Sequence, residues 1–91
     1  EDDYSILNKV VNLQFSYNSI IIEGHTDDVG THKQNRIVAN ARVDVAFEYL
    51  IKKGVNPTKI VRHPIGESMP TANNGTVGGR ANNRRLMLIL K

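Results

Sequence analysis

The spacing of apolar residues along the chain predicts an alternation of helices and strands. Leu7, Val10 and Val11 lie at helical spacing near the beginning, whereas Ile20 to Ile22 form a β-branched run typical of a buried strand. The apolar run near the end predicts a strand that is central in its sheet. The predicted order is a helix at residues 3–15, a strand at 20–22, a helix at 31–53, a strand at 60–66, a loop at 67–78 and a strand at 85–90.

The longest predicted helix has sequence signals at both of its ends. Thr31 followed by Gln34 resembles a capping box, in which side chains and backbone amides bond reciprocally. Gly54 suits the position after the last helical residues, and Pro57 prevents the helix from continuing. The apolar face expected to pack on the sheet consists of Ile37 or Val38, Ala41, Val45 and Leu50.

Strands that alternate with helices predict a two-layer α/β (α+β) sandwich, with both helices on one face of a small mixed sheet. Pro64 lies within the strand predicted at 60–66, so that strand is expected at a sheet edge or at a bulge. Ligands of such sheets tend to bind at the carboxyl ends of strands. The loop Gly24–Gly30 occupies such an end and is the first place to look for a site.

Composition narrows the class of protein only moderately. A length of 91 residues allows one domain, residues 1–91, with a modest core, and a formal charge of +3 does not by itself indicate nucleic acid. The absence of cysteine excludes disulfides, thiolate metal sites and cysteine nucleophiles. The longest apolar run, Leu86–Leu90, is far too short for a membrane span, and the acidic start is unlike a secretory signal. We therefore expect a mature domain or a piece of something longer.

Four polar side chains are candidates for one binding site. Asp27 directly follows a predicted strand, and Arg84 is expected to begin the last one. Asn35 and Arg42 lie two turns apart on one face of the long helix, and the small Ala39 between them is expected to leave a groove. Guanidinium groups bind carboxylates in a bidentate manner, and carboxylates bind ammonium groups. If the four converge, they match a zwitterionic ligand such as the free end of a diamino acid.

The same residues also allow simpler interpretations. Asp27 could pair with Arg42 and tie the loop to the helix, an interaction worth about 0–1 kcal/mol when exposed. Arg84 and Arg85 would then be solvated charges at a strand end. Together with Arg80 they also allow a nucleic-acid binder, although aromatic residues are only 5% of the chain and do not interleave with the arginines.

Catalysis and metal binding are not expected. His25, His32 and His63 show no metal-ligand spacing, and no serine lies in a nucleophile context. Asp27 and Asp28 are adjacent at a strand end, where neighbouring side chains point apart, which disfavours a general acid–base pair. A hydrolase that uses either aspartate as its base is therefore the least favoured alternative.

The order of several motifs is similar to that of a known family. These motifs are Gly24-His25-Thr26-Asp27, Gly30, Asn35, Arg42, Gly54, Gly66-Glu67, Pro70, Asn74, Gly79-Arg80-Ala81 and Asn83-Arg84-Arg85. The pattern resembles the OmpA-like C-terminal domain, a family that includes outer-membrane protein A, the peptidoglycan-associated lipoprotein and the flagellar stator protein MotB. The resemblance runs from about residue 4 to the end of the chain. It implies a β-α-β-α-β-β sandwich whose first strand is missing here.

The resemblance also implies a function. Members of this family bind peptidoglycan non-covalently, through the diaminopimelate of its stem peptide, and without catalysis, cofactor or metal ion. The family's GHTD aspartate and the arginine of the following helix hold the diamino acid, and they correspond to Asp27 and Arg42. By the same resemblance, Asn35 matches the helix asparagine and Arg84 the first arginine of the Asn-Arg-Arg motif.

The family further implies a location and partners. The chain is expected to be the periplasmic domain of an outer-membrane or envelope-anchored bacterial protein. Its expected partners are peptidoglycan, other envelope proteins and a second copy of itself, and no nucleic acid is expected. The sequence departs from the family at Val38-Ala39, where Leu-Ser is usual, and at Val43, where alanine is usual.

Overall fold

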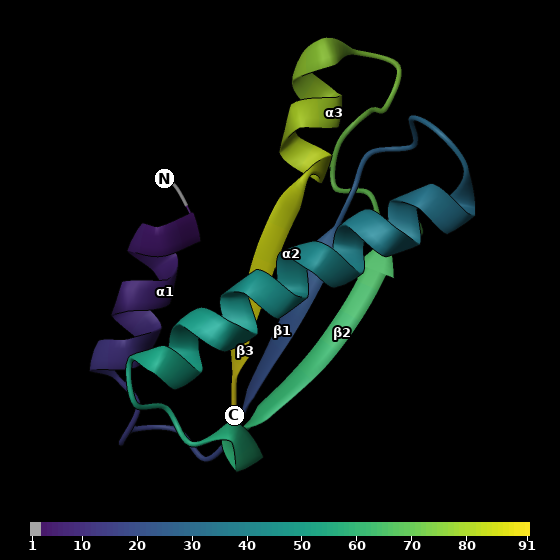
Figure 1. The fold of residues 1–91 in the computed structure, drawn as a ribbon. Coiled ribbons are helices and arrows are strands. Elements are labelled where there is room, and N and C mark those ends of the chain that lie inside the picture. Colours follow the sequence, from purple (N-terminus) through teal and green to yellow (C-terminus); the bar gives the residue numbers. More distant parts are fainter. Residues whose placement is uncertain (1–2) are drawn as a thin grey trace.

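The computed structural model describes residues 3–91 and shows helices layered on a small sheet, which confirms the predicted fold class (Figure 1). The elements, in chain order, are α1 (Asp3–Asn12), β1 (Ile20–His25), α2 (His32–Lys52), the 3₁₀ turn η1 (Pro57–Lys59), β2 (Ile60–Gly66), α3 (Val77–Asn83) and β3 (Arg85–Leu90). Within residues 3–91, no helix combines the length and the apolar character needed to cross a membrane.

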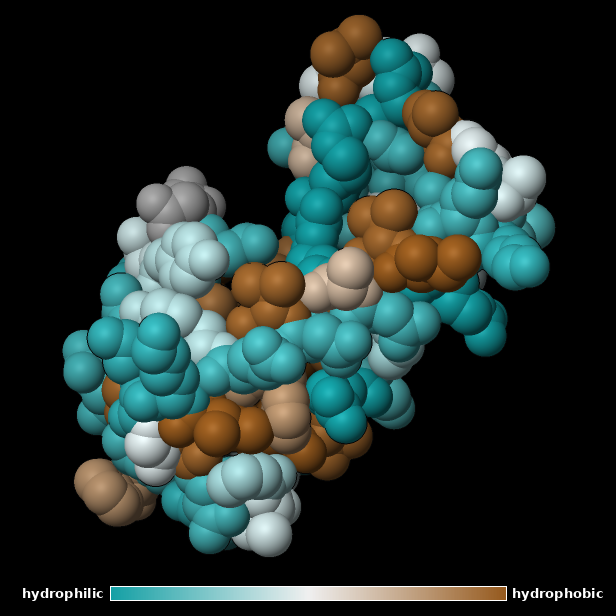
Figure 2. Space-filling view, viewed as in Figure 1, coloured by the Kyte–Doolittle hydropathy of each residue, from teal (hydrophilic) through white to brown (hydrophobic). Residues whose placement is uncertain are grey.

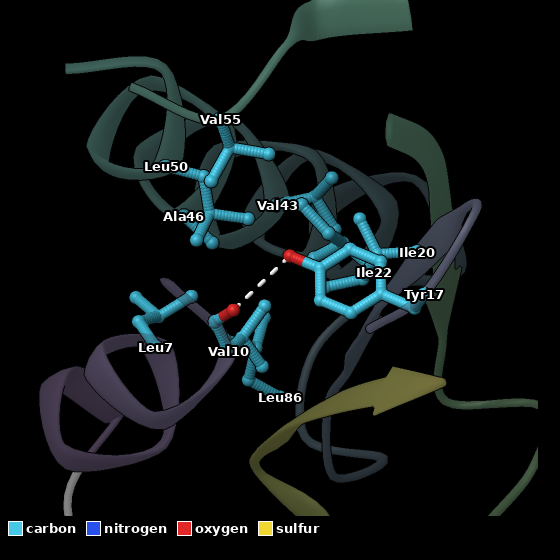
Figure 3. Packing of buried hydrophobic residues seen from close by; sticks show 10 residues of the cluster. All are labelled: Leu7, Val10, Tyr17, Ile20, Ile22, Val43, Ala46, Leu50, Val55 and Leu86. Carbon is cyan, nitrogen blue, oxygen red and sulfur yellow. Dashed lines mark hydrogen bonds between the residues drawn. The ribbon is translucent and has the colours of Figure 1, made fainter. Parts of the chain in front are cut away.

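An apolar core lies between the first two helices and one face of the sheet. Leu7 of α1 and Val43 of α2 belong to the same buried cluster as Ile22 of β1, so both helices cover the same face (Figure 3). Tyr17, in the connection to β1, is buried in this cluster and donates its hydroxyl proton to the carbonyl oxygen of Val10 over 3.1 Å. The cluster consists of Leu7, Val10, Tyr17, Ile20, Ile22, Val43, Ala46, Leu50, Val55 and Leu86.

The described sheet has the order β2-β1-β3, with β1 parallel to β2 and antiparallel to β3. The prediction that the last strand is central is therefore wrong for the described residues, because β1 lies in the middle. The apolar run of β3 has another cause. Leu86 is buried on the helix side, whereas Met87 and Leu90 are each 39% exposed, so apolar content alone did not separate a central strand from an edge strand.

The prediction for Pro64 is confirmed in both of its forms. The proline lies in β2, at an edge of the described sheet, which is where prolines within strands are tolerated. Beside it, the pairing with β1 shifts register: Gly24 pairs with Pro64, but His25 pairs with Gly66. This irregularity lies directly before the loop that holds Asp27.

The end signals of α2 are confirmed. The side chain of Thr31 accepts from the backbone of Gln34, and the side chain of Gln34 accepts from the backbone of Thr31, each over 3.0 Å. Gly54 follows the helix with φ +97°, a backbone conformation that favours glycine. The helix therefore begins and ends where the sequence predicts within two residues.

The predicted buried face of α2 is wrong except at Leu50. Ile37, Val38 and Val45 are 58%, 47% and 57% exposed, so these three β-branched residues lie largely at the surface. The helix instead turns a face of mostly small side chains toward the sheet. That buried face consists of Asn35, Ala39, Val43, Ala46 and Leu50.

The small residues allow α2 to approach β1 closely. A Cβ atom on Gly24 would lie 2.6 Å from the carbonyl oxygen of Ala39 and 2.8 Å from Cγ2 of Val43. Ala39 is fully buried, so it does not leave the groove that was expected beside it. Its small side chain serves packing between helix and strand, and the groove lies elsewhere on α2.

Part of the segment predicted as loop is helical. α3 begins after Thr76, whose hydroxyl oxygen accepts from the backbone of Gly79 over 2.9 Å. Two glycines in seven residues disfavour a helix by propensity, which explains why it was missed. Gly79 is needed here because a Cβ atom would collide with the backbone carbonyl of Asn73.

Candidate functional site

Asp27 lies two residues after β1, at the end of the sheet where the parallel strand β2 also ends (Figure 1). The backbone N–H of the preceding Thr26 donates to the carbonyl oxygen of Gly66 over 2.9 Å, which ties the loop to the end of β2. Only 10% of the Asp27 side chain is exposed. The carboxylate is thus held by a rigid strand end, as the sequence predicted.

Both carboxylate oxygens of Asp27 have a partner. Oδ2 accepts from Nη1 of Arg84 over 2.7 Å, and Oδ1 accepts from the backbone N–H of Val29 over 3.0 Å. The hydrogen bond from Arg84 lowers the pKa of Asp27, and the bond from Val29 acts in the same direction, whereas burial opposes it. Asp27 is therefore ionised at neutral pH and oriented toward Arg84.

Arg84 lies between the end of α3 and the start of β3. It was expected to begin the last strand, which begins one residue later, at Arg85. The backbone N–H of Arg84 donates to the carbonyl oxygen of Arg80, which closes the end of α3. The side chain is 48% exposed, so solvent reaches the guanidinium beside its bond to Asp27. Donors that this bond does not use can face a ligand.

Arg42 does not pair with Asp27, so the simpler interpretation of a loop-to-helix salt bridge is wrong. Its Nη1 atom donates instead to the carbonyl oxygen of His25 over 3.2 Å. That carbonyl lies two residues before Asp27, at the same strand end. Arg42 and Asp27 therefore flank one short stretch of backbone without neutralising each other.

Arg42 also lines a groove of about 330 Å³ between α1, α2 and β3. The space-filling view shows a notch between α1 and α3, with hydrophobic side chains along the exposed side of α2 (Figure 2). The groove thus places apolar surface next to a guanidinium. Its lining residues are Asp3, Tyr4, Leu7, Val38, Ala41, Arg42, Val45, Ala46 and Leu86.

The side-chain hydrogen bond of Asn35 goes to Glu67 and not to Asp27 or Arg84. Asn35 is 6% exposed, and its Nδ2 atom donates to Oε1 of Glu67, directly after β2, over 3.2 Å. The structure therefore brings Asp27 and Arg84 together, places Arg42 close by through His25, and joins Asn35 to a residue that was not predicted to matter.

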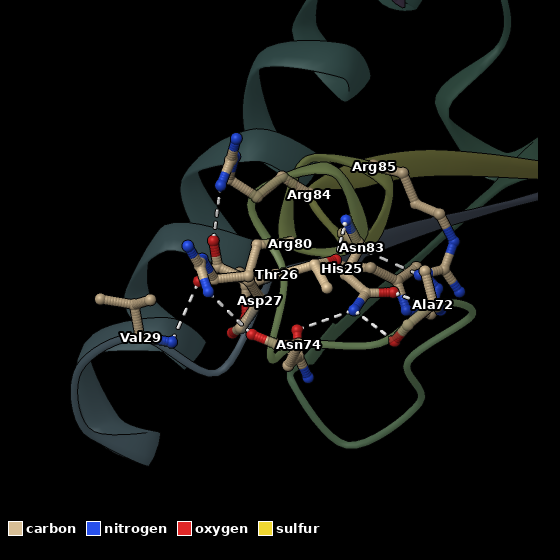
Figure 4. Close-up of polar contacts among 12 residues, drawn as sticks. His25, Thr26, Asp27, Val29, Ala72, Asn74, Arg80, Asn83, Arg84 and Arg85 are labelled. Carbon is tan, nitrogen blue, oxygen red and sulfur yellow. Dashed lines mark hydrogen bonds and ion pairs between the residues drawn. The ribbon is translucent and has the colours of Figure 1, made fainter.

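Asn83 has a structural role that the sequence did not indicate. It is fully buried, and its Oδ1 atom accepts from the backbone N–H groups of Thr71 and Ala72 over 2.8 and 3.0 Å (Figure 4). Its Nδ2 atom donates to the carbonyl oxygen of Ala72 and to Oδ1 of Asn74. The asparagine of the Asn-Arg-Arg motif thus fastens the loop before α3 next to Arg84. The position of Asn83 in that motif is the sequence feature that could have indicated this role.

The arginines near the end of the chain do not form one basic surface. Arg80 donates to the carbonyl oxygen of Asn74 and Arg85 to that of Met69, while Arg84 pairs with Asp27. Each is thus engaged with a different part of the chain. This arrangement disfavours a continuous strip of phosphate contacts.

His25 is buried and its Nε2 atom lies 3.0 Å from Oε1 of Glu23, as expected for a histidine that bonds within its strand. Among residues 3–91, no three side chains of the His, Cys, Asp or Glu type are placed to hold a metal ion. The site is thus built from an ion pair, a nearby guanidinium and an apolar groove.

These features define a small α/β domain with a charged candidate site at one end of its sheet. A sequence profile described as the OmpA family matches residues 1–84, and the chain belongs to that family.

Individual relatives agree with this assignment. Outer membrane porin F of Pseudomonas fluorescens is 38% identical over 73 residues, which cover 80% of this chain and 22% of that protein. Peptidoglycan-associated lipoprotein of Buchnera aphidicola is 38% identical over 74 residues, which cover 81% of this chain and 43% of the lipoprotein. The chain therefore spans less than half the length of these relatives.

Solved structures show the same fold. The crystal structure of the peptidoglycan-associated lipoprotein from Burkholderia pseudomallei superposes with a TM-score of 0.86 at 26% sequence identity. The match covers 100% of this chain and 80% of that one. The similarity to the lipoprotein structure therefore includes every element from α1 to β3.

Proposed function

We propose that the chain is a non-catalytic module that binds peptidoglycan through the diaminopimelate of the stem peptide. The observation that carries the proposal is the ionised Asp27 paired with Arg84, with Arg42 at the same strand end beside a groove. Relatives named as peptidoglycan-associated lipoproteins support the choice of polymer.

The charges suit the two ends of a diamino-acid side arm. The carboxylate of Asp27 accepts from the ligand's ammonium group, and the guanidinium groups of Arg42 and Arg84 donate to its carboxylate. The aliphatic part of the side arm lies along the apolar groove. Asn35 completes the proposed set through Oδ1, because its Nδ2 atom already donates to Glu67.

A binding role fits the electrostatics better than catalysis. A general base is most effective when its pKa lies near the operating pH, and Arg84 shifts the pKa of Asp27 downward, away from that range. We therefore propose that the module holds the cell wall and does not hydrolyse it, as the periplasmic part of an outer-membrane or envelope-anchored protein. Contacts with other envelope proteins and homodimerisation stay predictions from the resemblance.

The test is retention of the protein on purified Gram-negative sacculi. Arg42→Ala is expected to weaken binding about tenfold or more, since a hydrogen bond to a charged group contributes roughly 1.5–3 kcal/mol. Arg36→Ala removes an equally charged but exposed side chain from the same helix and is the matched control. Free meso-diaminopimelate should compete with sacculi for the wild type.

Unchanged binding of a folded Arg42→Ala variant would contradict the proposal. So would equal competition by a diaminopimelate-containing stem peptide and by the matching lysine-containing stem peptide, because the lysine side chain ends in an ammonium group without the carboxylate that the guanidinium groups are proposed to hold. DNA and RNA oligomers serve as the comparison polymers. A salt-dependent complex with them, in the absence of binding to sacculi, would favour the nucleic-acid alternative.

A further inference from the structure

Glu67 connects the end of β2 to the first turns of α2. Its Oε1 atom accepts from Nδ2 of Asn35 over 3.2 Å and lies 2.8 Å from Nδ1 of His32. The Glu67 side chain is 16% exposed, whereas that of His32 is 94% exposed. The contact of Glu67 with Asn35 is therefore largely buried, whereas its contact with His32 is exposed to solvent.

The backbone before Glu67 is tied to the binding loop. Gly66 has φ +77°, a conformation that favours glycine and lets the chain turn against α2. Its carbonyl oxygen accepts from the N–H of Thr26, the residue before Asp27, over 2.9 Å. Glu67 thus reaches α2 with its side chain from a segment that already holds the Asp27 loop.

The carboxylate fixes which way the amide of Asn35 points. A carboxylate accepts hydrogen bonds and does not donate them, so the Nδ2 side of Asn35 must face Glu67. Oδ1 then faces the other end of the loop, 3.9 Å from where a Cβ atom on Gly30 would lie. Because Asn35 is buried between the two segments, a reversed amide would place its donor toward the loop and its acceptor against a carboxylate.

We propose that Glu67 is the positioning residue of the binding loop formed by residues 27–30. It acts through Asn35, whose orientation sets the chemical group offered to the loop and to a ligand bound there. The inference rests on the proposed binding of diaminopimelate at Asp27, to which it adds a residue that does not itself touch the ligand. His32 is an accessory partner that is not required.

The experiment compares three substitutions, with affinity measured on a soluble diaminopimelate-containing muropeptide. Glu67→Ala is expected to weaken binding about fivefold or more, since it removes the acceptor that orients a buried amide. Glu67→Gln keeps an oxygen that can accept from Asn35 but adds an amide donor, so it no longer enforces one orientation of Asn35 and should lose less affinity than Glu67→Ala. His32→Ala should stay within about twofold of the wild type, because its side chain is exposed.

A double-mutant cycle separates positioning from general stability. Asn35→Ala and Glu67→Ala should together cost no more affinity than the larger single loss, because the two residues act as one unit. Amide proton–nitrogen NMR spectra should show shifted signals for Val29 and Gly30 in Glu67→Ala, and smaller shifts in Glu67→Gln. A purely structural role would lower the melting temperature without this pattern.

Arg42→Ala, measured in parallel, distinguishes failure of this inference from failure of the proposed function. If Glu67→Ala binds the muropeptide as tightly as the wild type while Arg42→Ala does not bind it, the role of Glu67 is overturned and the proposed function is not. If the wild type does not bind the muropeptide, the proposed function fails. The NMR spectra then decide the positioning role, which is overturned if the Val29 and Gly30 signals of Glu67→Ala are unshifted.

Discussion

Arg84 and Asp27 stand 57 positions apart in the chain and meet in an ion pair with 2.7 Å between Nη1 and Oδ2. The pair joins the end of α3 to the loop after β1. It also sets the charge state of the candidate site, because the hydrogen bond from Arg84 lowers the pKa of Asp27. Stability and the proposed binding therefore depend on the same carboxylate.

The lowered pKa predicts how stability depends on pH. The folded form binds a proton at Asp27 less readily than the unfolded form, whose ordinary value is near 3.8. The stabilisation is complete above that value and is lost as the pH falls through the lower pKa of the folded protein. We predict that the stability difference between the wild type and Asp27→Asn shrinks between about pH 5 and about pH 2.

Urea unfolding at several pH values measures this difference. The loss should be about 1 kcal/mol or less, because Arg84 is half-exposed and solvent screens the pair. High salt should reduce it further. A constant difference across the acidic range would contradict the assignment of the lowered pKa to Asp27.

Adding a single methyl group at Gly24 is expected to lower the stability of the protein markedly. Gly24→Ala would place a Cβ atom 2.6 Å from the carbonyl oxygen of Ala39, and backbone atoms cannot move aside as a flexible side chain would. We expect a loss of about 1–3 kcal/mol, typical of overpacking, measured as a lower urea midpoint. The helix α2 would have to shift away from β1.

Gly78→Ala is the matched control for that substitution. Gly78 lies within α3, and a Cβ atom there would meet nothing within 4 Å. Alanine is favoured over glycine inside a helix by about 0.5–1 kcal/mol, so the variant should be as stable as the wild type or more stable. Equal losses for the two substitutions would show that contact with α2 is not the cause.

Substitution of Asn83 is expected to lower the free energy of unfolding by more than substitution of an ordinary surface residue would. Asn83→Ala removes the amide oxygen that accepts from the N–H groups of Thr71 and Ala72, and the amide nitrogen that donates to the carbonyl oxygen of Ala72. We expect a cost of about 1–3 kcal/mol, since the lost hydrogen bonds of this buried side chain contribute roughly 0.5–1.5 kcal/mol each. Thermal unfolding followed by circular dichroism measures it.

The neighbouring Asn82 is exposed, so Asn82→Ala is the control and should change stability by less than about 0.5 kcal/mol. Because Asn83 fastens the loop beside Arg84, its substitution should also weaken binding to sacculi below the melting temperature. A destabilised Asn83→Ala variant that binds as tightly as the wild type would limit the residue to a role in folding.

Sequence patterns predicted the layers of the fold but not which face of α2 is buried. Capping at Thr31 and the edge position of Pro64 depend on local rules, and both are confirmed. The buried face depends on how closely two elements approach, and Gly24 and Ala39 set that distance. Hydrophobic spacing favoured Val38 and Val45, which lie largely exposed on α2.

The same distinction applies to the candidate site. Asp27 and Arg84, two of the four candidate residues, meet in an ion pair that spacing along the chain alone could not predict, because they come from distant elements. The contact between Asn35 and Glu67 could not be predicted, because it depends on the turn at Gly66 and on the direction of a buried amide. Motif positions indicated which residues matter but not which of them contact one another.

Tyr17 predicts a second, opposite dependence on pH. Its hydroxyl group is in the core, bonded to the carbonyl oxygen of Val10, and burial raises its pKa above the ordinary 10.0. At alkaline pH the unfolded chain loses this proton before the folded protein does, so stability falls as the pH rises above about 10. Tyr17→Phe has no such proton to lose.

Tyr17→Phe should therefore be less stable than the wild type at neutral pH by about 0.5–1.5 kcal/mol, the usual value of one hydrogen bond. That difference should narrow as the pH rises from about 8 to about 11, because only the wild type must keep a buried phenol protonated. Other titrating groups are common to both proteins and cancel in the comparison. A difference between wild type and Tyr17→Phe that widens with pH would mean that the folded protein stabilises the phenolate.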